Sequence, residues 1–163
     1  MAAIPKVSFT DQKTLYMKAA IHHKMNLQTA NNGVTPLMIA LESKNLPFIS
    51  EAVGQNGVLK DIVNFSLSDK HNRNYVYYAV SLHIQCHPTT EPEKEKDGVL
   101  LKVINGNNTG AREVDSEGRT PLHLAVASKR LDIVKFIVSR CPNALEHNSK
   151  SVASLLHVAA EVG

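Results

Sequence analysis

Residues 118–138 read GRTPLHLAVASKRLDIVKFIV, and this stretch decides the fold. Thr120 can cap a helix, because its hydroxyl accepts a hydrogen bond from a backbone N–H two or three residues further on. Pro121 then takes the first helical position, where the missing N–H costs nothing. An apolar stripe with helical spacing follows from Leu131. The stretch therefore predicts two antiparallel helices joined by a short turn.

Four other segments repeat this motif less completely. They are residues 14–20, 35–40, 74–80 and 154–160. The closest echoes are TPLMIA at residues 35–40 and SLLHVAA at residues 154–160, and the latter begins 34 residues after Thr120 (154 − 120). Asn or Ser stands at the cap position where the proline is lost, so the capping role is expected to survive there. The pattern indicates internal repetition.

A period near 33 residues with the motif Thr-Pro-Leu-His-x-Ala is the ankyrin-repeat signature. Residues 115–138 resemble an ankyrin repeat nearly position by position, and the resemblance covers roughly residues 11–163. It implies an all-α fold, an ankyrin-repeat solenoid of stacked helix-turn-helix units with about four to five repeats, the first and last incomplete. It also implies that His123 and His157 are structural hydrogen-bonding residues. Met38 and Tyr77 replace this histidine in two units, whose turns should be held less firmly.

The expected domain organisation is a flexible N-terminus at residues 1–10 and an ankyrin-repeat domain at residues 11–163. Its units are expected at about residues 11–32, 33–71, 72–117, 118–151 and 152–163, the last of them truncated. Helices are expected near residues 36–43, 46–54, 75–85 and 98–105, with a single helix at residues 11–23 in the first unit. Residues 88–97, which are polar and of mixed charge, are interpreted as an exposed insertion.

The fifth unit stops at Gly163, directly after its first helix. Terminal repeats normally carry a polar outer face, whereas this ending leaves the apolar face of Leu155, Leu156 and Val158 half covered. The pattern predicts that the chain is a fragment of a longer array, with further repeats or domains beyond Gly163.

Composition argues against several classes of partner. The formal net charge is +3 and no cluster of Lys and Arg accompanies it, so no nucleic-acid partner is expected. No apolar run approaches the roughly 20 residues that a membrane helix needs, so no membrane insertion is expected. The two cysteines, Cys86 and Cys141, are too few for a disulfide framework and favour a reducing compartment. We therefore expect a cytoplasmic location, with the nucleus as the alternative.

Metal binding has two weak candidates. His83, Cys86 and His87 share one helical face, but structural zinc sites usually have four ligands, and no second pair follows. His22 and His23 are adjacent, so on a helix they point in different directions. We expect no metal site and no cofactor.

Catalysis has little support either. A nucleophile at Cys141 is disfavoured by the partial negative charge of a helix C-terminus. No phosphate-binding, dinucleotide-binding, metalloprotease or nucleophile-elbow motif appears in the sequence. We therefore expect no catalytic residue and no enzymatic activity.

The resemblance implies a non-catalytic protein–protein interaction module. It places binding at the positions that the repeat leaves variable, in the concave groove and at the turn tips. The expected partner-binding residues are Asn31, Asn32, Val34, Glu42, Ser43, Lys44, Lys70, His71, Arg73, Ser116, Glu117, Arg119, Ala127, Ser128 and Lys129. The Lys and Arg residues in this row favour an acidic or polar segment of a partner protein or peptide.

Two related alternatives stay open. The chain could be a regulatory or targeting segment of a larger protein, such as a channel, a kinase or an adaptor. It could also be a bacterial effector whose repeats engage a host protein. An enzyme would instead need a pocket that holds a nucleophile and a base within hydrogen-bond reach.

Overall fold

The computed structural model describes residues 24–53, 62–85, 93–107, 109–146 and 154–163. Over these residues the regular structure is helical, apart from one isolated bridge between Ser68 and Asn74. The elements are α2 (Pro36–Glu42), α3 (Leu46–Val53), α4 (Tyr75–Gln85), α5 (Glu93–Gly106), α6 (Pro121–Ala127), α7 (Leu131–Arg140), the 3₁₀ helix η1 (Pro142–Leu145) and α8 (Leu155–Val162). The all-α class predicted from the sequence is therefore confirmed for the described residues.

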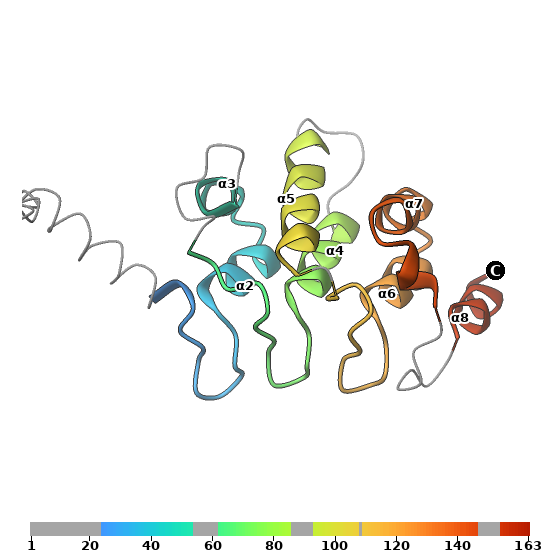
Figure 1. Cartoon of the computed structure of the whole chain (residues 1–163), viewed down its shortest axis with the longest axis horizontal. Helices are drawn as coiled ribbons and strands as arrows, with labels where there is room; N and C mark the ends of the chain where they lie inside the picture. The colour runs from blue at the N-terminus through green and yellow to red at the C-terminus, as the bar shows by residue number, and fades with distance from the viewer. Residues whose placement is uncertain (1–23, 54–61, 86–92, 108, 147–153) are drawn as a thin grey trace, which may run out of the picture.

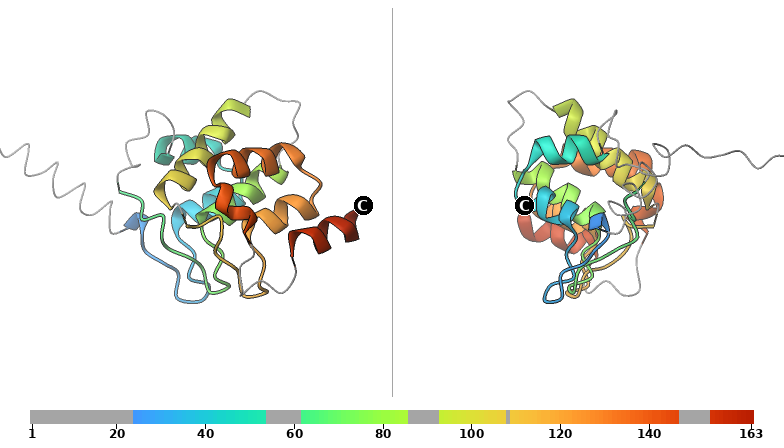
Figure 2. Two further views of the ribbon diagram at one scale, coloured as in Figure 1. Left: turned by 45° about the vertical axis from the view of Figure 1, so that its right-hand side comes forward. Right: turned by 90° about the vertical axis from the view of Figure 1, so that its left-hand side faces the viewer.

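The helices form two rows (Figure 1). α2, α4, α6 and α8 follow one another along the molecule, and neighbouring members of this row are in contact. α3, α5 and α7 lie on one side of that row, and each contacts the helix that precedes it in the chain. The loops that lead into α2, α4 and α6 project to the opposite side (Figure 2).

All helices of the first row begin with the same kind of cap. The cap residues are Thr35, Asn74, Thr120 and Ser154. Each side-chain oxygen accepts a hydrogen bond from the backbone N–H three residues later, at 3.1 to 3.4 Å. The prediction that Asn74 and Ser154 cap without a following proline is confirmed. A local interaction thus sets where each helix starts.

The motif histidine closes the cap from the other side. Nδ1 of His123 accepts a hydrogen bond from the backbone N–H of Thr120 at 3.1 Å and lies 2.7 Å from the Thr120 hydroxyl oxygen. Together with the cap bond this forms a reciprocal pair, as in a capping box. Nδ1 of His157 lies 2.6 Å from the hydroxyl oxygen of Ser154. Both histidines therefore have the structural role that the resemblance implies.

The hydrophobic core lies between the two rows and is deepest at α4. The buried residues of this helix are Tyr75, Val76, Tyr77, Tyr78, Ala79, Val80, Leu82 and His83. α8 has no buried residue, and its Leu156 is 81% exposed. Because full burial of an aliphatic side chain contributes roughly 2 kcal/mol, the middle of the row is stabilised most strongly and α8 least.

Three hairpins lead into the first-row helices: the first comprises residues 29–34, the second residues 69–73 and the third residues 115–119. They are joined in sequence by backbone hydrogen bonds, from Lys70 N to Asn32 O (2.9 Å) and from Ser116 N to His71 O (2.7 Å). The residue two positions before each cap has a positive φ, namely Gly33 at 66°, Asn72 at 59° and Gly118 at 75°. Glycine adopts this conformation without cost and asparagine tolerates it. The three turns therefore share a positive-φ residue at the same distance from the cap, although the first turn is one residue longer than the other two.

The helix α5 begins earlier than the sequence predicts. α5 starts at Glu93 instead of near residue 98, so residues 93–97 are helical and do not belong to an irregular insertion. The physical reason is that Glu and Lys, which alternate in this segment, are strong helix formers. Residues 88–92 of the expected insertion, and the expected helix at residues 11–23, lie outside the described residues.

Candidate partner-binding groove

The second hairpin is held by a buried carboxylate. The Asp69 side chain is 1% exposed, and its Oδ1 accepts hydrogen bonds from the backbone N–H groups of His71 (2.8 Å) and Arg73 (2.9 Å). Its Oδ2 accepts from Nε of Arg73 at 2.7 Å and from the Tyr78 hydroxyl at 2.9 Å. The guanidinium also lies over the Tyr78 ring, 5.2 Å from its centroid. Arg73 is therefore committed to the hairpin itself.

These bonds decide the charge state of Asp69. Burial alone raises the pKa of the carboxyl, because it disfavours the charged form. The hydrogen bonds from Arg73, Tyr78 and His71 favour the carboxylate and outweigh burial, so the pKa of Asp69 lies below its ordinary value. Asp69 is thus ionised at neutral pH and its charge is matched by Arg73.

The third hairpin repeats this arrangement. Oδ1 of Asp115 accepts from the backbone N–H groups of Glu117 and Arg119, both at 2.9 Å. Nη2 of Arg119 lies 3.0 Å from Oδ2 of Asp115, and its Nη1 lies 2.9 Å from Oε2 of Glu117. The charges of this hairpin are therefore paired with one another.

The first hairpin lacks the Asp–Arg pair. Thr29 and Val34 stand at its two ends, joined by bonds from Thr29 N to Val34 O (3.0 Å) and from Val34 N to the Thr29 hydroxyl oxygen (3.3 Å). Nε2 of Gln28 also donates to the carbonyl oxygens of Gly33 (2.6 Å) and Ser68 (2.7 Å). The turn is well bonded through its backbone, but no arginine lies over the adjacent helix.

A groove of about 660 Å³ opens beside this first hairpin, between it, α2 and the second hairpin. We call it the hairpin groove. It is lined by Thr29, Asn31, Asn32, Val34, Ile39, Glu42, Lys70, His71 and Arg73. All of these except Thr29 and Ile39 are among the partner-binding residues expected from the sequence. The structure thus brings together residues from two hairpins and one helix that are distant in the sequence.

Sequence reasoning missed Ile39 because it treated the whole Thr-Pro-Leu-His-x-Ala motif as structural. Ile39 is 47% exposed, whereas Tyr78, at the equivalent position four residues after its cap, is 3% exposed. Arg73 covers Tyr78, but the residue equivalent to Arg73 beside Ile39 is Val34. The small, apolar residue directly before the cap was the available signal, since it cannot reach over the helix.

The other expected residues lie outside the hairpin groove. Ser116, Glu117 and Arg119 belong to the third hairpin. The remainder lie at or directly after the C-terminal ends of α2 and α6, namely Ser43, Lys44, Ala127, Ser128 and Lys129. Ser43 and Ser128 are the C-caps of α2 and α6. These residues are therefore distributed along the row and do not form one continuous site with the groove.

Lys44 and Lys129 have a conformation that is unusual for lysine. Their φ angles are 58° and 56°, in the left-handed region that normally holds glycine after a helix. The Lys44 ammonium lies 3.5 Å from the Gln85 carbonyl oxygen at the end of α4, and that of Lys129 lies 3.3 Å from the Gly163 carbonyl oxygen after α8. Each thus interacts with the C-terminal end of the next helix in the row, where a positive charge is favourable.

The basic character expected of the row is therefore reduced by internal contacts. Arg73 and Arg119 are paired with carboxylates, and Lys44 and Lys129 contact helix ends. Lys70 differs, because its side chain has no hydrogen bond or ion pair within the described part of the chain. The hairpin groove is lined by Lys70, Arg73 and Glu42. Because Asp69 already matches the charge of Arg73, the charges of Lys70 and Glu42 leave the groove nearly neutral.

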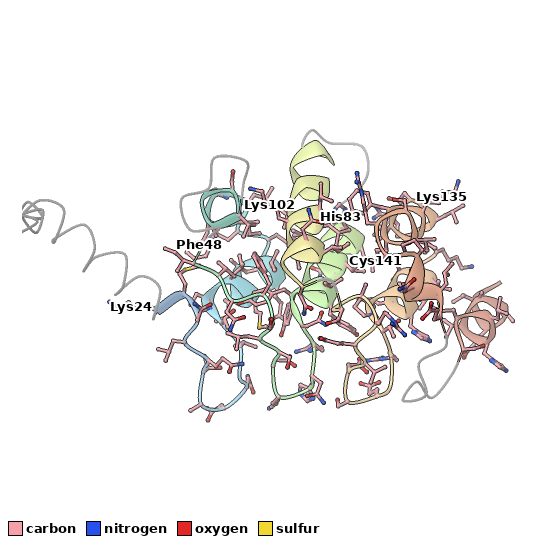
Figure 3. All side chains as sticks on the ribbon, in the orientation of Figure 1. Lys24, Phe48, His83, Lys102, Lys135 and Cys141 are labelled. Carbon is pink, nitrogen blue, oxygen red and sulfur yellow. The ribbon has the colours of Figure 1, made fainter. Side chains whose placement is uncertain are left out.

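The described residues considered for catalysis or metal binding lie outside the hairpin groove. Figure 3 shows Cys141 and His83 away from the hairpin tips. Burial raises the pKa of the Cys141 thiol, which keeps it protonated and unsuited to nucleophilic attack at neutral pH. Among the described residues, no group of three or more His, Cys, Asp or Glu side chains is placed to hold a metal ion. His22, His23, Cys86 and His87 lie outside those residues.

Comparison with known families gives one match. The ankyrin-repeat family model matches residues 117–148, which include α6, α7 and η1, and the match supports an ankyrin repeat in this segment. Ankyrin repeats are typically non-catalytic modules for protein–protein interaction, so the match supports this general class. No curated protein matches the chain significantly.

Within the described residues, no helix has the length and apolar character needed to cross a membrane.

Proposed function

We propose that this chain is a non-catalytic interaction module that binds a segment of a partner protein through the hairpin groove. The observation that carries the proposal is the gathering of seven independently expected residues around one open groove: Asn31, Asn32, Val34, Glu42, Lys70, His71 and Arg73. The groove combines exposed amide and charged groups with an exposed aliphatic side chain, Ile39. This combination suits a protein segment, which offers both backbone polar groups and side chains.

The groove also has a physical reason to bind. Ile39 is 47% exposed at a position where the equivalent tyrosine is buried, so an apolar partner side chain can cover it. Asn31 and Asn32 are exposed and carry amide donors and acceptors that fit an extended backbone. The hairpins and α2 are held by backbone bonds and caps, so little order has to be gained on binding.

We further propose that the two rows of helices are the stacked units of an ankyrin solenoid with about four to five repeats. The recurrence of cap, positive-φ turn and helix pair supports units at about residues 33–71, 72–117 and 118–151, followed by an incomplete unit at residues 152–163. Repeats stacked in this way present their hairpins and first helices on one extended surface, of which the hairpin groove is a part.

The test is a peptide-display selection on the intact chain, followed by affinity measurements on Ile39→Asp and Leu131→Asp. Both residues are exposed aliphatic side chains, but Leu131 lies on α7 in the other row and serves as the matched control. We expect the selected peptides to bind Ile39→Asp at least about tenfold more weakly, because a charge replaces apolar contact, and to bind Leu131→Asp unchanged. If the selected peptides bind Ile39→Asp with unchanged affinity and bind Leu131→Asp more weakly, the hairpin groove is not the binding site.

A further inference from the structure

Three side chains of the hairpin groove face solvent and lack a hydrogen bond or ion pair within the described residues, although the Glu42 carboxylate also attracts the charge of Arg73. Ile39 is 47% exposed, and the exposed side chains of Lys70 and Glu42 make no hydrogen bond or ion pair within the described residues. Arg73 differs from Lys70, because Asp69 and Tyr78 already hold its guanidinium. The groups that remain for a ligand are thus one cation, one aliphatic side chain and one anion.

These three groups follow a fixed order along the groove. Lys70 stands in the second hairpin, whose backbone N–H bonds to the tip of the first hairpin at Asn32 O. Ile39 lies in the middle of α2, and Glu42 is the last residue of that helix. Ile39 and Glu42 are three residues apart and therefore share one face of the helix. The groove runs from a positive end at the hairpins, across an apolar centre, to a negative end.

We propose that the hairpin groove selects an extended peptide segment with an acidic residue, an apolar residue and a basic residue in that spatial order. The acidic side chain pairs with Lys70, the apolar one covers Ile39 and Val34, and the basic one pairs with Glu42. This inference rests on the binding role proposed above and adds the chemistry of the partner. It replaces a uniformly acidic partner with one that carries both charges.

The dimensions of α2 set the spacing within the peptide. Its seven residues span about 10 Å at a rise of 1.5 Å per residue, while an extended chain advances about 3.3 Å per residue. The helix length alone corresponds to about three positions of an extended peptide. Because residues i, i+2 and i+4 of an extended chain point to the same face, the acidic and basic residues are expected about four positions apart, with the apolar residue between them. Charge complementarity of this kind contributes more to selectivity than to total affinity.

The inference is tested with the full chain and a synthetic peptide, acetyl-Ser-Asp-Ser-Leu-Ser-Arg-Ser-amide with a fluorescent label, by fluorescence anisotropy. Lys70→Glu is expected to weaken binding by about fivefold or more, because an attraction becomes a repulsion. Replacing the peptide's aspartate by lysine should restore affinity for this variant. In the same way, Glu42→Lys should weaken binding and be rescued when the peptide's arginine is replaced by glutamate.

Lys135→Glu is the matched control, since Lys135 is an exposed lysine on α7, in the other row. It changes the net charge as Lys70→Glu does and is expected to leave the affinity unchanged. Thermal melts of all variants establish that they remain folded.

The outcomes separate this inference from the function on which it rests. Equal loss with Lys135→Glu, or no rescue by the swapped peptides, overturns the charge order. So does failure of the designed peptide to bind while display selects Ile39-dependent peptides of another composition, and in that case the binding function stands. If no selected peptide depends on Ile39, the binding function and this inference both fail.

Discussion

The first and third hairpins differ in how they use their side chains. In the third hairpin, Asp115 accepts two backbone N–H groups and pairs with Arg119, so its polar groups are occupied within the turn. In the first hairpin, Thr29 and Val34 close the turn mainly through the backbone, and the adjacent Ile39 remains exposed. The region that follows the family pattern most closely is thus internally satisfied, whereas the region that departs from it carries the groove.

The largest expected effect comes from removing a buried carboxylate. Asp69→Ala leaves two backbone N–H groups, the Arg73 guanidinium and the Tyr78 hydroxyl without their acceptor, and should lower the free energy of unfolding by about 3 kcal/mol. Thr29→Ala, at the corresponding end of the first hairpin, should cost less than about 1 kcal/mol. Urea denaturation of both variants measures the difference. Equal losses would mean that the hairpins are held alike.

Making the first hairpin resemble the others should close the groove. Arg73 covers Tyr78 in the second hairpin, and Val34 holds the equivalent position in the first. In Val34→Arg, the new arginine should therefore lie over the exposed Ile39. We expect display-selected peptides to lose about tenfold in affinity, equivalent to about 1.4 kcal/mol, while stability changes by less than about 0.5 kcal/mol. Calorimetric titration and thermal melts check the two halves of this prediction. Unchanged peptide affinity would show that Ile39 does not contribute to binding.

A smaller effect is expected at Lys44 and Lys129, which have the same left-handed conformation after α2 and α6. Lys129→Gly removes the cost of a left-handed conformation after α6 and should stabilise the chain by up to about 1 kcal/mol, less the lost contact with the Gly163 carbonyl oxygen. Lys44→Gly should act in the same direction after α2. Denaturation midpoints measure both. Destabilisation by either substitution would indicate that the ammonium contact outweighs the backbone cost.

The smallest expected effect is on the pH dependence of stability at acidic pH. Because the folded-state pKa of Asp69 lies below its ordinary value of about 3.9, its contribution to stability is complete above that pH and is lost as the pH falls through the folded-state pKa. Asp69→Asn removes this titration, so its stability should fall less steeply than that of the wild type between about pH 5 and pH 3. Urea melts at both pH values test the slope. Parallel slopes would show that Asp69 titrates normally.

Local signals in the sequence predict the helix starts well. The bounds expected for the first helices, near residues 36–43 and 75–85, agree with α2 and α4 as observed. Cap and turn residues act on their own segment, so they can be recognised without knowing what packs against it. The predicted start of α5, near residue 98, was wrong because the local signals in that segment conflict. Charge and nearby prolines suggested a loop, although the helix propensity of the Glu–Lys segment favoured a helix.

The candidate site was predictable only in part. The sequence predicted the hairpin residues as positions that the repeat leaves free, but it did not distinguish those that gather around a groove from those that do not. Lys44 and Lys129 were expected to face a partner, and the structure places their ammonium groups at neighbouring helix ends. Such contacts join residues 41 and 34 positions apart, and no local pattern predicts them.

The sequence by itself determined the repeated unit, because caps, positive-φ turns and apolar stripes are properties of short segments. It also predicted the ankyrin-repeat resemblance, through the motif that begins at Thr120, and the family model matches residues 117–148 around that motif. Only the tertiary structure decided where the surface opens. Ile39 is exposed because Val34 is too short to cover it and because the second hairpin brings Lys70 and Arg73 alongside without filling the space. That outcome depends on side-chain volumes brought together across two units, which only the packed fold defines.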